Sequence, residues 1–145
     1  MKKCLLFFSI ILVVIVLGIM LAATGFIVLS ESPVKSKILY AKGVVNVIQE
    51  ALTNYFQDNG VYPTTHQGLQ ALVTKPSTQP IPKNYSPNGY LVRLTYDPWG
   101  KPYQYTYQLV NGKHKITILS WGADGKLGGK GYNADIIGIF ETEAK

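Results

Sequence analysis

Residues 5–29 have the sequence LLFFSIILVVIVLGIMLAATGFIVL, and residues 34–56 have the sequence VKSKILYAKGVVNVIQEALTNYF. The first segment is apolar and uncharged, whereas the second is amphipathic, and together they predict one long helix, broken or bent near Pro33. Apolar residues at three- and four-residue spacing form one stripe on the second segment: Ala41, Val44, Val45, Ile48, Ala51, Leu52, Tyr55 and Phe56. This stripe needs a packing partner from residues 60–145.

The apolar segment is long enough to cross a membrane. A helix over residues 5–29 reaches about 37 Å, more than the roughly 30 Å hydrocarbon core of a bilayer. Lys2, Lys3 and the small residues at 23–25 also resemble parts of a cleavable signal peptide, but the apolar run is longer than such peptides use. We therefore expect residues 1–33 to be a retained membrane anchor, with the N-terminus cytoplasmic and residues 34–145 exported.

Composition limits the exported part to one small domain with a single core. The net charge of +6 comes from lysines spread singly along the chain, without the basic cluster that nucleic-acid binding requires. The single cysteine, Cys4, excludes an internal disulfide. We expect no nucleic-acid partner.

The region after the long helix begins with strong turn signals. Asp58-Asn59-Gly60 followed by Pro63 predicts the end of the helix, and Thr64 or Thr65 can cap a short helix that runs to about Val73. The four prolines between residues 75 and 88 predict an ordered loop or a lid without regular secondary structure.

A β-hairpin is predicted near the middle of this domain. Tyr103, Tyr105 and Tyr107 alternate with polar residues, Asn111-Gly112 supplies a turn, and residues 116–119 begin a second β-rich run. The long helix should pack on this hairpin.

A glycine-rich loop, residues 122–135, is the one place where polar groups converge. Asp124, Asp135, Asn133 and backbone carbonyls are the hard oxygen ligands that Ca²⁺ prefers. The spacing does not match an EF-hand, and Lys126 and Lys130 oppose a divalent ion, so a metal-free loop stays an alternative.

Catalytic patterns are missing from the sequence. There is no nucleophile elbow and no paired glutamate arrangement, so we expect no enzyme. His66 and His114 have no cysteine or carboxylate at ligand spacing, and we expect both at the surface. A second hypothesis is a membrane-anchored periplasmic binding module that holds a peptide or glycan in a tyrosine-rich groove; an exposed groove would favour it.

Several short blocks carry a resemblance to a known family. They are DNGVYPTT (58–65), QGLQAL (67–72), KNY (83–85), GYL (89–91), DPWGKPYQY (97–105), GADG (122–125) and NADI (133–136). In this order and spacing the blocks closely resemble protein G, the major pseudopilin family of the type II secretion system.

The resemblance implies an α+β, type IV pilin-like fold in which a long N-terminal helix packs against a small antiparallel sheet. It implies a structural, non-enzymatic component, subunit or accessory, of the pseudopilus, a short periplasmic filament that helps push folded exoproteins through an outer-membrane channel. Implied partners are other pseudopilins, further copies of the chain, the membrane and the inner-membrane components of the secretion system. The implied location is the bacterial inner membrane, with a single span and the head in the periplasm.

The resemblance also implies a metal site and a processing site. The family's loop binds calcium, which places ligands at Asp124, Asp135 and backbone oxygens near Leu119 and Leu127, with Asn133 as a further candidate. Family members are cut after a glycine that precedes Phe-Thr-Leu-Ile-Glu.

The N-terminus departs from that family motif. Cys4 or Leu5 stands in place of the glycine, and Ser9 or Ile10 in place of the glutamate. Processing at this point and ordinary filament assembly therefore stay open, and the segment suits a permanent single-span anchor.

Overall fold

The computed structural model describes residues 11–20 and 33–144 and divides into two compact units, residues 1–35 and 36–145. In the first unit, residues 11–20 are helical. Within the described residues, no helix combines the length and apolar character needed to cross a membrane. Most of the expected anchor, including Cys4 and Leu5, lies outside the described residues.

Helix α2 (Pro33–Asn59) contains the amphipathic stripe that the sequence predicts. Six stripe residues are buried: Ala41, Val45, Ile48, Ala51, Leu52 and Tyr55. Val44 and Phe56 are half-buried at the edge of the core. The helix ends at Asn59, and the Gly60 N–H donates to the Phe56 carbonyl, so the predicted C-terminus is confirmed.

Three antiparallel strands form the sheet in the order β1-β2-β3: β1 (Gln104–Val110), β2 (Lys113–Ser120) and β3 (Ile136–Glu143). The predicted hairpin is confirmed, because Val110 pairs with Lys113 across the Asn111-Gly112 turn. Strand β3 pairs with β2 along its whole length, from Ile136 opposite Ser120 to Glu143 opposite Lys113.

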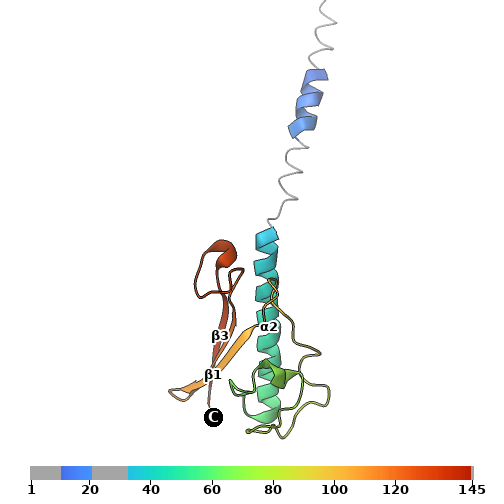
Figure 1. Ribbon diagram of the computed structural model, residues 1–145. Coiled ribbons are helices and arrows are strands. Elements are labelled where there is room, and N and C mark those ends of the chain that lie inside the picture. Colours follow the sequence, from blue (N-terminus) through green and yellow to red (C-terminus); the bar gives the residue numbers. More distant parts are fainter. Residues whose placement is uncertain (1–10, 21–32, 145) are drawn as a thin grey trace, which may run out of the picture. The chain divides into compact units, whose positions relative to one another are not determined.

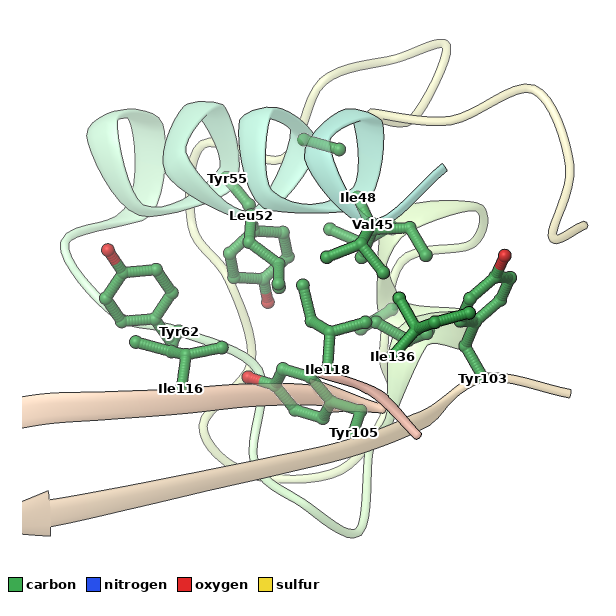
Figure 2. Packing of buried hydrophobic residues seen from close by; sticks show 14 of the residues in the cluster. Val45, Ile48, Leu52, Tyr55, Tyr62, Tyr103, Tyr105, Ile116, Ile118 and Ile136 are labelled. Carbon is green, nitrogen blue, oxygen red and sulfur yellow. The ribbon is translucent and has the colours of Figure 1, made fainter. Parts of the chain in front are cut away.

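The core lies between α2 and one face of this sheet. Figure 2 shows Val45, Ile48 and Leu52 of α2 facing the sheet. The sheet and the segments beside it contribute Tyr62, Tyr103, Tyr105, Ile116, Ile118 and Ile136 to the same cluster. The packing is close enough that a Cβ on Gly138 of β3 would collide with the Val45 side chain. The α+β architecture with a helix packed on a small antiparallel sheet is confirmed.

Two tyrosines, Tyr103 immediately before β1 and Tyr105 within it, belong to the core. Tyr103 and Tyr105 are buried, and the Tyr105 hydroxyl donates to the Pro63 carbonyl at 2.8 Å. Burial raises the pKa of Tyr103 to about 12 and raises the pKa of Tyr105 as well. The exposed tyrosine groove that a peptide- or glycan-binding module needs is therefore not formed by these two tyrosines.

The segment between α2 and the sheet differs in one respect from the prediction. Thr64 and Gln67 form the reciprocal hydrogen bonds of a capping box, because the Gln67 N–H donates to Thr64 Oγ1 and the Thr64 N–H donates to Gln67 Oε1, but only a turn follows them directly. The predicted short helix ends near Val73 as expected, but it is only the 3₁₀ helix η1 (Leu69–Leu72), whose N-cap is Gly68 and not a threonine. Gly68, at φ 62°, breaks the helical path.

The proline-rich stretch is an ordered loop, as predicted. Residues 75–88 contain no helix or strand, and the Gln67 side chain donates to the Thr78 carbonyl at 2.7 Å. The Asn84 N–H donates to Asn59 Oδ1 at 3.0 Å, which ties the loop to the end of α2.

The two histidines lie in different surroundings. His66 is exposed, as expected, but the expected surface position of His114 is wrong. The His114 ring is half-buried, with centroids 5.2 Å from Phe56 and 5.4 Å from Tyr62. Its Nδ1 lies 2.9 Å from the Tyr107 hydroxyl, so stacking and a hydrogen bond with its β1 neighbour hold it inside an aromatic cluster.

The helix–sheet contact predicts a large difference between two adjacent positions on α2. Ile48 is 4% exposed and Val47 is 55% exposed. Ile48→Asp should lower the free energy of unfolding by at least about 3 kcal/mol, because it buries an unpaired charge, whereas Val47→Asp should change it by about 0.5 kcal/mol or less. Urea unfolding followed by circular dichroism measures both, and equal stabilities would contradict the helix–sheet packing.

Candidate functional site in the glycine-rich loop

The loop between β2 and β3 folds back on itself at the end of the sheet (Figure 1). Its two arms meet backbone to backbone: a Cβ on Gly122 would lie 2.7 Å from the Ala134 carbonyl oxygen and 3.0 Å from that of Asn133. The Ala123 N–H donates to the Tyr132 carbonyl at 3.2 Å. Glycine at 122 is thus required by the close approach of the two arms.

The two predicted carboxylate ligands have different surroundings. Asp124 is exposed, and its Oδ1 accepts the Lys126 N–H at 3.1 Å. Asp135 is half-buried, and its Oδ2 accepts the Gly128 N–H at 2.8 Å. Its other oxygen, Oδ1, is buried and has no hydrogen-bond partner among the residues that the structure describes. A buried carboxylate oxygen without a donor is unfavourable, and a bound cation would satisfy it.

The remaining predicted ligands lie partly in the loop and partly in β2. Asn133 closes the short helix η2 (Gly131–Asn133) and donates its N–H to the Lys130 carbonyl. Leu119 is inside β2, where it pairs with Ile137, and Leu127 is 79% exposed in the loop. Among the described residues no group of three or more His, Cys, Asp or Glu side chains could hold a metal. A metal here would depend on the two carboxylates together with backbone oxygens.

A buried carboxylate that sequence reasoning did not single out supports the base of the loop. Asp97 is 4% exposed, and its Oδ1 accepts the N–H groups of Trp99 at 3.0 Å and Lys101 at 2.8 Å. Its Oδ2 accepts the Ser120 hydroxyl at 2.6 Å. Ser120 Oγ in turn accepts the Gly122 N–H at 3.3 Å. The carboxylate therefore joins the Asp97–Gly100 turn, the end of β2 and the start of the loop.

Lys101 is the second residue that the sequence analysis missed. Its ammonium donates to the carbonyls of Ala123 at 3.2 Å and Gly122 at 3.5 Å. The motif DPWGK indicates a turn, but nothing local in the sequence shows that its lysine reaches a loop more than twenty residues further on.

Tyr132 connects the loop with α2 and with the turn. Its ring lies 5.7 Å from the Trp99 ring in an edge-to-face arrangement. The Lys37 ammonium lies 3.3 Å from the Tyr132 hydroxyl and 5.8 Å from its ring centroid. The hydrogen bond from Lys37 lowers the pKa of Tyr132. The loop thus has contacts with α2 as well as with the sheet.

Comparison with known proteins gives one consistent family. The family model "Type II secretion system (T2SS), protein G" matches residues 29–139. The type II secretion system core protein G of Pseudomonas aeruginosa is 46% identical over 128 residues, which cover 88% of each chain. The protein of the same name from Vibrio cholerae is 45% identical over 130 residues, covering 88% of this chain and 85% of that one.

The fold has a solved relative. The major pseudopilin from the type 2 secretion system of enterohaemorrhagic Escherichia coli superposes with a TM-score of 0.59 at 39% identity. The match covers 71% of this chain and 86% of the other. Sequence and structure therefore lead to the same group of proteins.

The buried carboxylate predicts a stability effect. Asp97→Ala should lower the free energy of unfolding by about 3 kcal/mol, because two N–H groups and one hydroxyl lose their acceptor in the interior. Asp124→Ala is the matched control: its carboxylate is exposed, so its effect should stay within about 1 kcal/mol. Chemical unfolding of both variants in EDTA provides the measurement. If Asp97→Ala were as stable as Asp124→Ala, Asp97 would not support the loop.

Proposed function

Since this chain belongs to the protein G family of the type II secretion system, the major pseudopilins, we propose that it is a filament-forming subunit of the periplasmic pseudopilus. As a member of this family it is a structural component of the pseudopilus. The observation that carries this conclusion is the match over residues 29–139, which includes all of α2, β1, β2 and the glycine-rich loop and the first half of β3. The role is structural and not catalytic.

The anchor belongs to this proposal. Residues 1–33 hold the chain in the bacterial inner membrane by a single span, and residues 34–145 form the periplasmic head. The uncharged segment 5–29 supports this arrangement, since its length exceeds a bilayer's hydrocarbon core. Cys4 and Leu5 stand at the family's processing position. A chain left uncut there would keep its anchor, and the span would contain no buried glutamate.

An exposed apolar face of α2 supports assembly with other subunits. Leu39 is 66% exposed, Tyr40 is 56% exposed and Val47 is 55% exposed. Tyr40 and Val47 are seven residues apart and so lie on the same side of the helix, along one edge of the buried stripe. The partners of this face are other copies of the chain or other pseudopilins, alongside the inner-membrane components of the secretion machinery.

Calcium binding at the glycine-rich loop is a further part of the proposal. The donors fit this ion, because carboxylate and carbonyl oxygens are its preferred ligands and Asp135 Oδ1 is buried without a partner. Asp124 and Asp135 would hold the ion, with the Asn133 side chain and backbone oxygens near Leu119 and Leu127 as further donors. The ion would stabilise the loop by neutralising the two carboxylates.

The assembly proposal predicts that Val47→Asp separates folding from function. In cells that carry the secretion system but lack their own copy of this protein, the variant should fold normally yet lose at least about 90% of exoprotein secretion, because a charge at the helix face blocks subunit contact. Secreted protein in the medium and chemical crosslinking in membranes measure secretion and assembly.

Asn54→Asp is the control for this experiment, since it adds the same charge at an exposed position of α2. It should secrete and crosslink like the wild type. If Val47→Asp secretes exoprotein and crosslinks as well as the wild type, this helix face makes no subunit contact.

The calcium proposal predicts a rise in melting temperature when calcium replaces EDTA, with a smaller rise for magnesium. Asp135→Asn should weaken calcium binding by about tenfold or more, because one of the two loop carboxylates is neutralised. Glu141→Gln removes one exposed charge from β3 and serves as the control, which should bind calcium like the wild type. Isothermal titration gives the affinities, and the absence of any calcium response would refute the site.

A further inference from the structure

We propose that Lys101 is a tethered cation that holds the carbonyls of the glycine-rich loop and competes electrostatically with calcium for the loop. This inference rests on the calcium site proposed above and concerns how tightly that site binds. Three observations carry it: the rigid attachment of Lys101, the position of its ammonium, and the difference between Lys101 and the two other lysines of the region.

The backbone of Lys101 is fixed on both sides of its Cα. Its N–H donates to Asp97 Oδ1 at 2.8 Å, and its carbonyl accepts the Asp97 N–H at 2.8 Å. Asp97 is buried and is itself held by Ser120. The side chain of Lys101 therefore starts from an anchored point beside the loop.

The ammonium of Lys101 lies on the loop backbone immediately before Asp124. It donates to the carbonyl oxygens of Ala123 at 3.2 Å and Gly122 at 3.5 Å. The lysine side chain also covers Gly125, where an added Cβ would collide with it. The ammonium therefore lies against the loop backbone on either side of Asp124, at residues 122–123 and at Gly125. The carbonyl oxygens that it contacts are of the kind that bind a hard cation.

Lys126 and Lys130 are placed differently. Both are exposed, so their ammonium groups are hydrated and free to turn away from a bound ion, and salt screens them. Lys101 is half-buried and bonded to the loop, so its charge is screened less. Among these three lysines, Lys101 should therefore have the largest effect on calcium affinity.

Two consequences follow for the loop. Without calcium, Lys101 supplies a donor to two carbonyls and helps the loop keep its conformation. With calcium, the ammonium repels the incoming ion, so the wild-type affinity is lower than the oxygen donors alone would give. Lys101 would thus make the loop less dependent on calcium for its order.

The test compares Lys101→Gln, Lys101→Arg and Lys126→Gln in the full-length chain purified in detergent. Glutamine keeps a donor for the carbonyls but removes the charge, and arginine keeps the charge. Calcium affinity is measured by isothermal titration, and melting temperature is measured in EDTA and in saturating calcium. Lys101→Gln should bind calcium about tenfold more tightly than the wild type, and its melting temperature should rise more on calcium addition.

Lys101→Arg and Lys126→Gln should bind calcium within about twofold of the wild type. If Lys101→Gln binds calcium no more tightly than the wild type, or if Lys126→Gln gains as much, the competition is refuted while the calcium site stands. If neither the wild type nor Lys101→Gln responds to calcium, the calcium site itself is wrong and the competition is refuted with it.

Discussion

The packing of α2 on the sheet is the contact on which the rest of the structure depends. A single amphipathic helix and a three-stranded sheet each leave an apolar face open to water, and burying the two faces against each other stabilises both. Val45 and Ile48 meet Ile118 in this layer, and Gly138 lets β3 approach the helix at Val45. The segment from Tyr62 to Leu72 then closes the rest of the same core.

Asp97 connects this core to the candidate site. A carboxylate that is 4% exposed needs its hydrogen bonds satisfied, and the Trp99 and Lys101 N–H groups and the Ser120 hydroxyl do so. The turn before β1, the end of β2 and the first residue of the loop are therefore held together. The loop starts from a rigid base, and the direction of the Lys101 side chain follows from the same hydrogen bonds.

The proposed function depends on two surfaces outside the core. One is the side of α2 that exposes Tyr40 and Val47, which suits contact between subunits. The other is the glycine-rich loop, where a buried, unpartnered oxygen of Asp135 lies in the same loop as two carbonyls that already have a donor in Lys101.

The sequence by itself determined the parts of this protein that depend on local periodicity and turn chemistry. The stripe on α2, its end at Asn59 and the hairpin at Asn111-Gly112 could all be predicted, because each needs only residues close in the chain. The tertiary structure alone decided that the predicted short helix is limited to the 3₁₀ helix η1, that His114 lies in an aromatic cluster, and that Asp97 meets Ser120. Contacts such as the last join residues 23 apart, and they follow from strand register and the path of the chain, which no local pattern encodes.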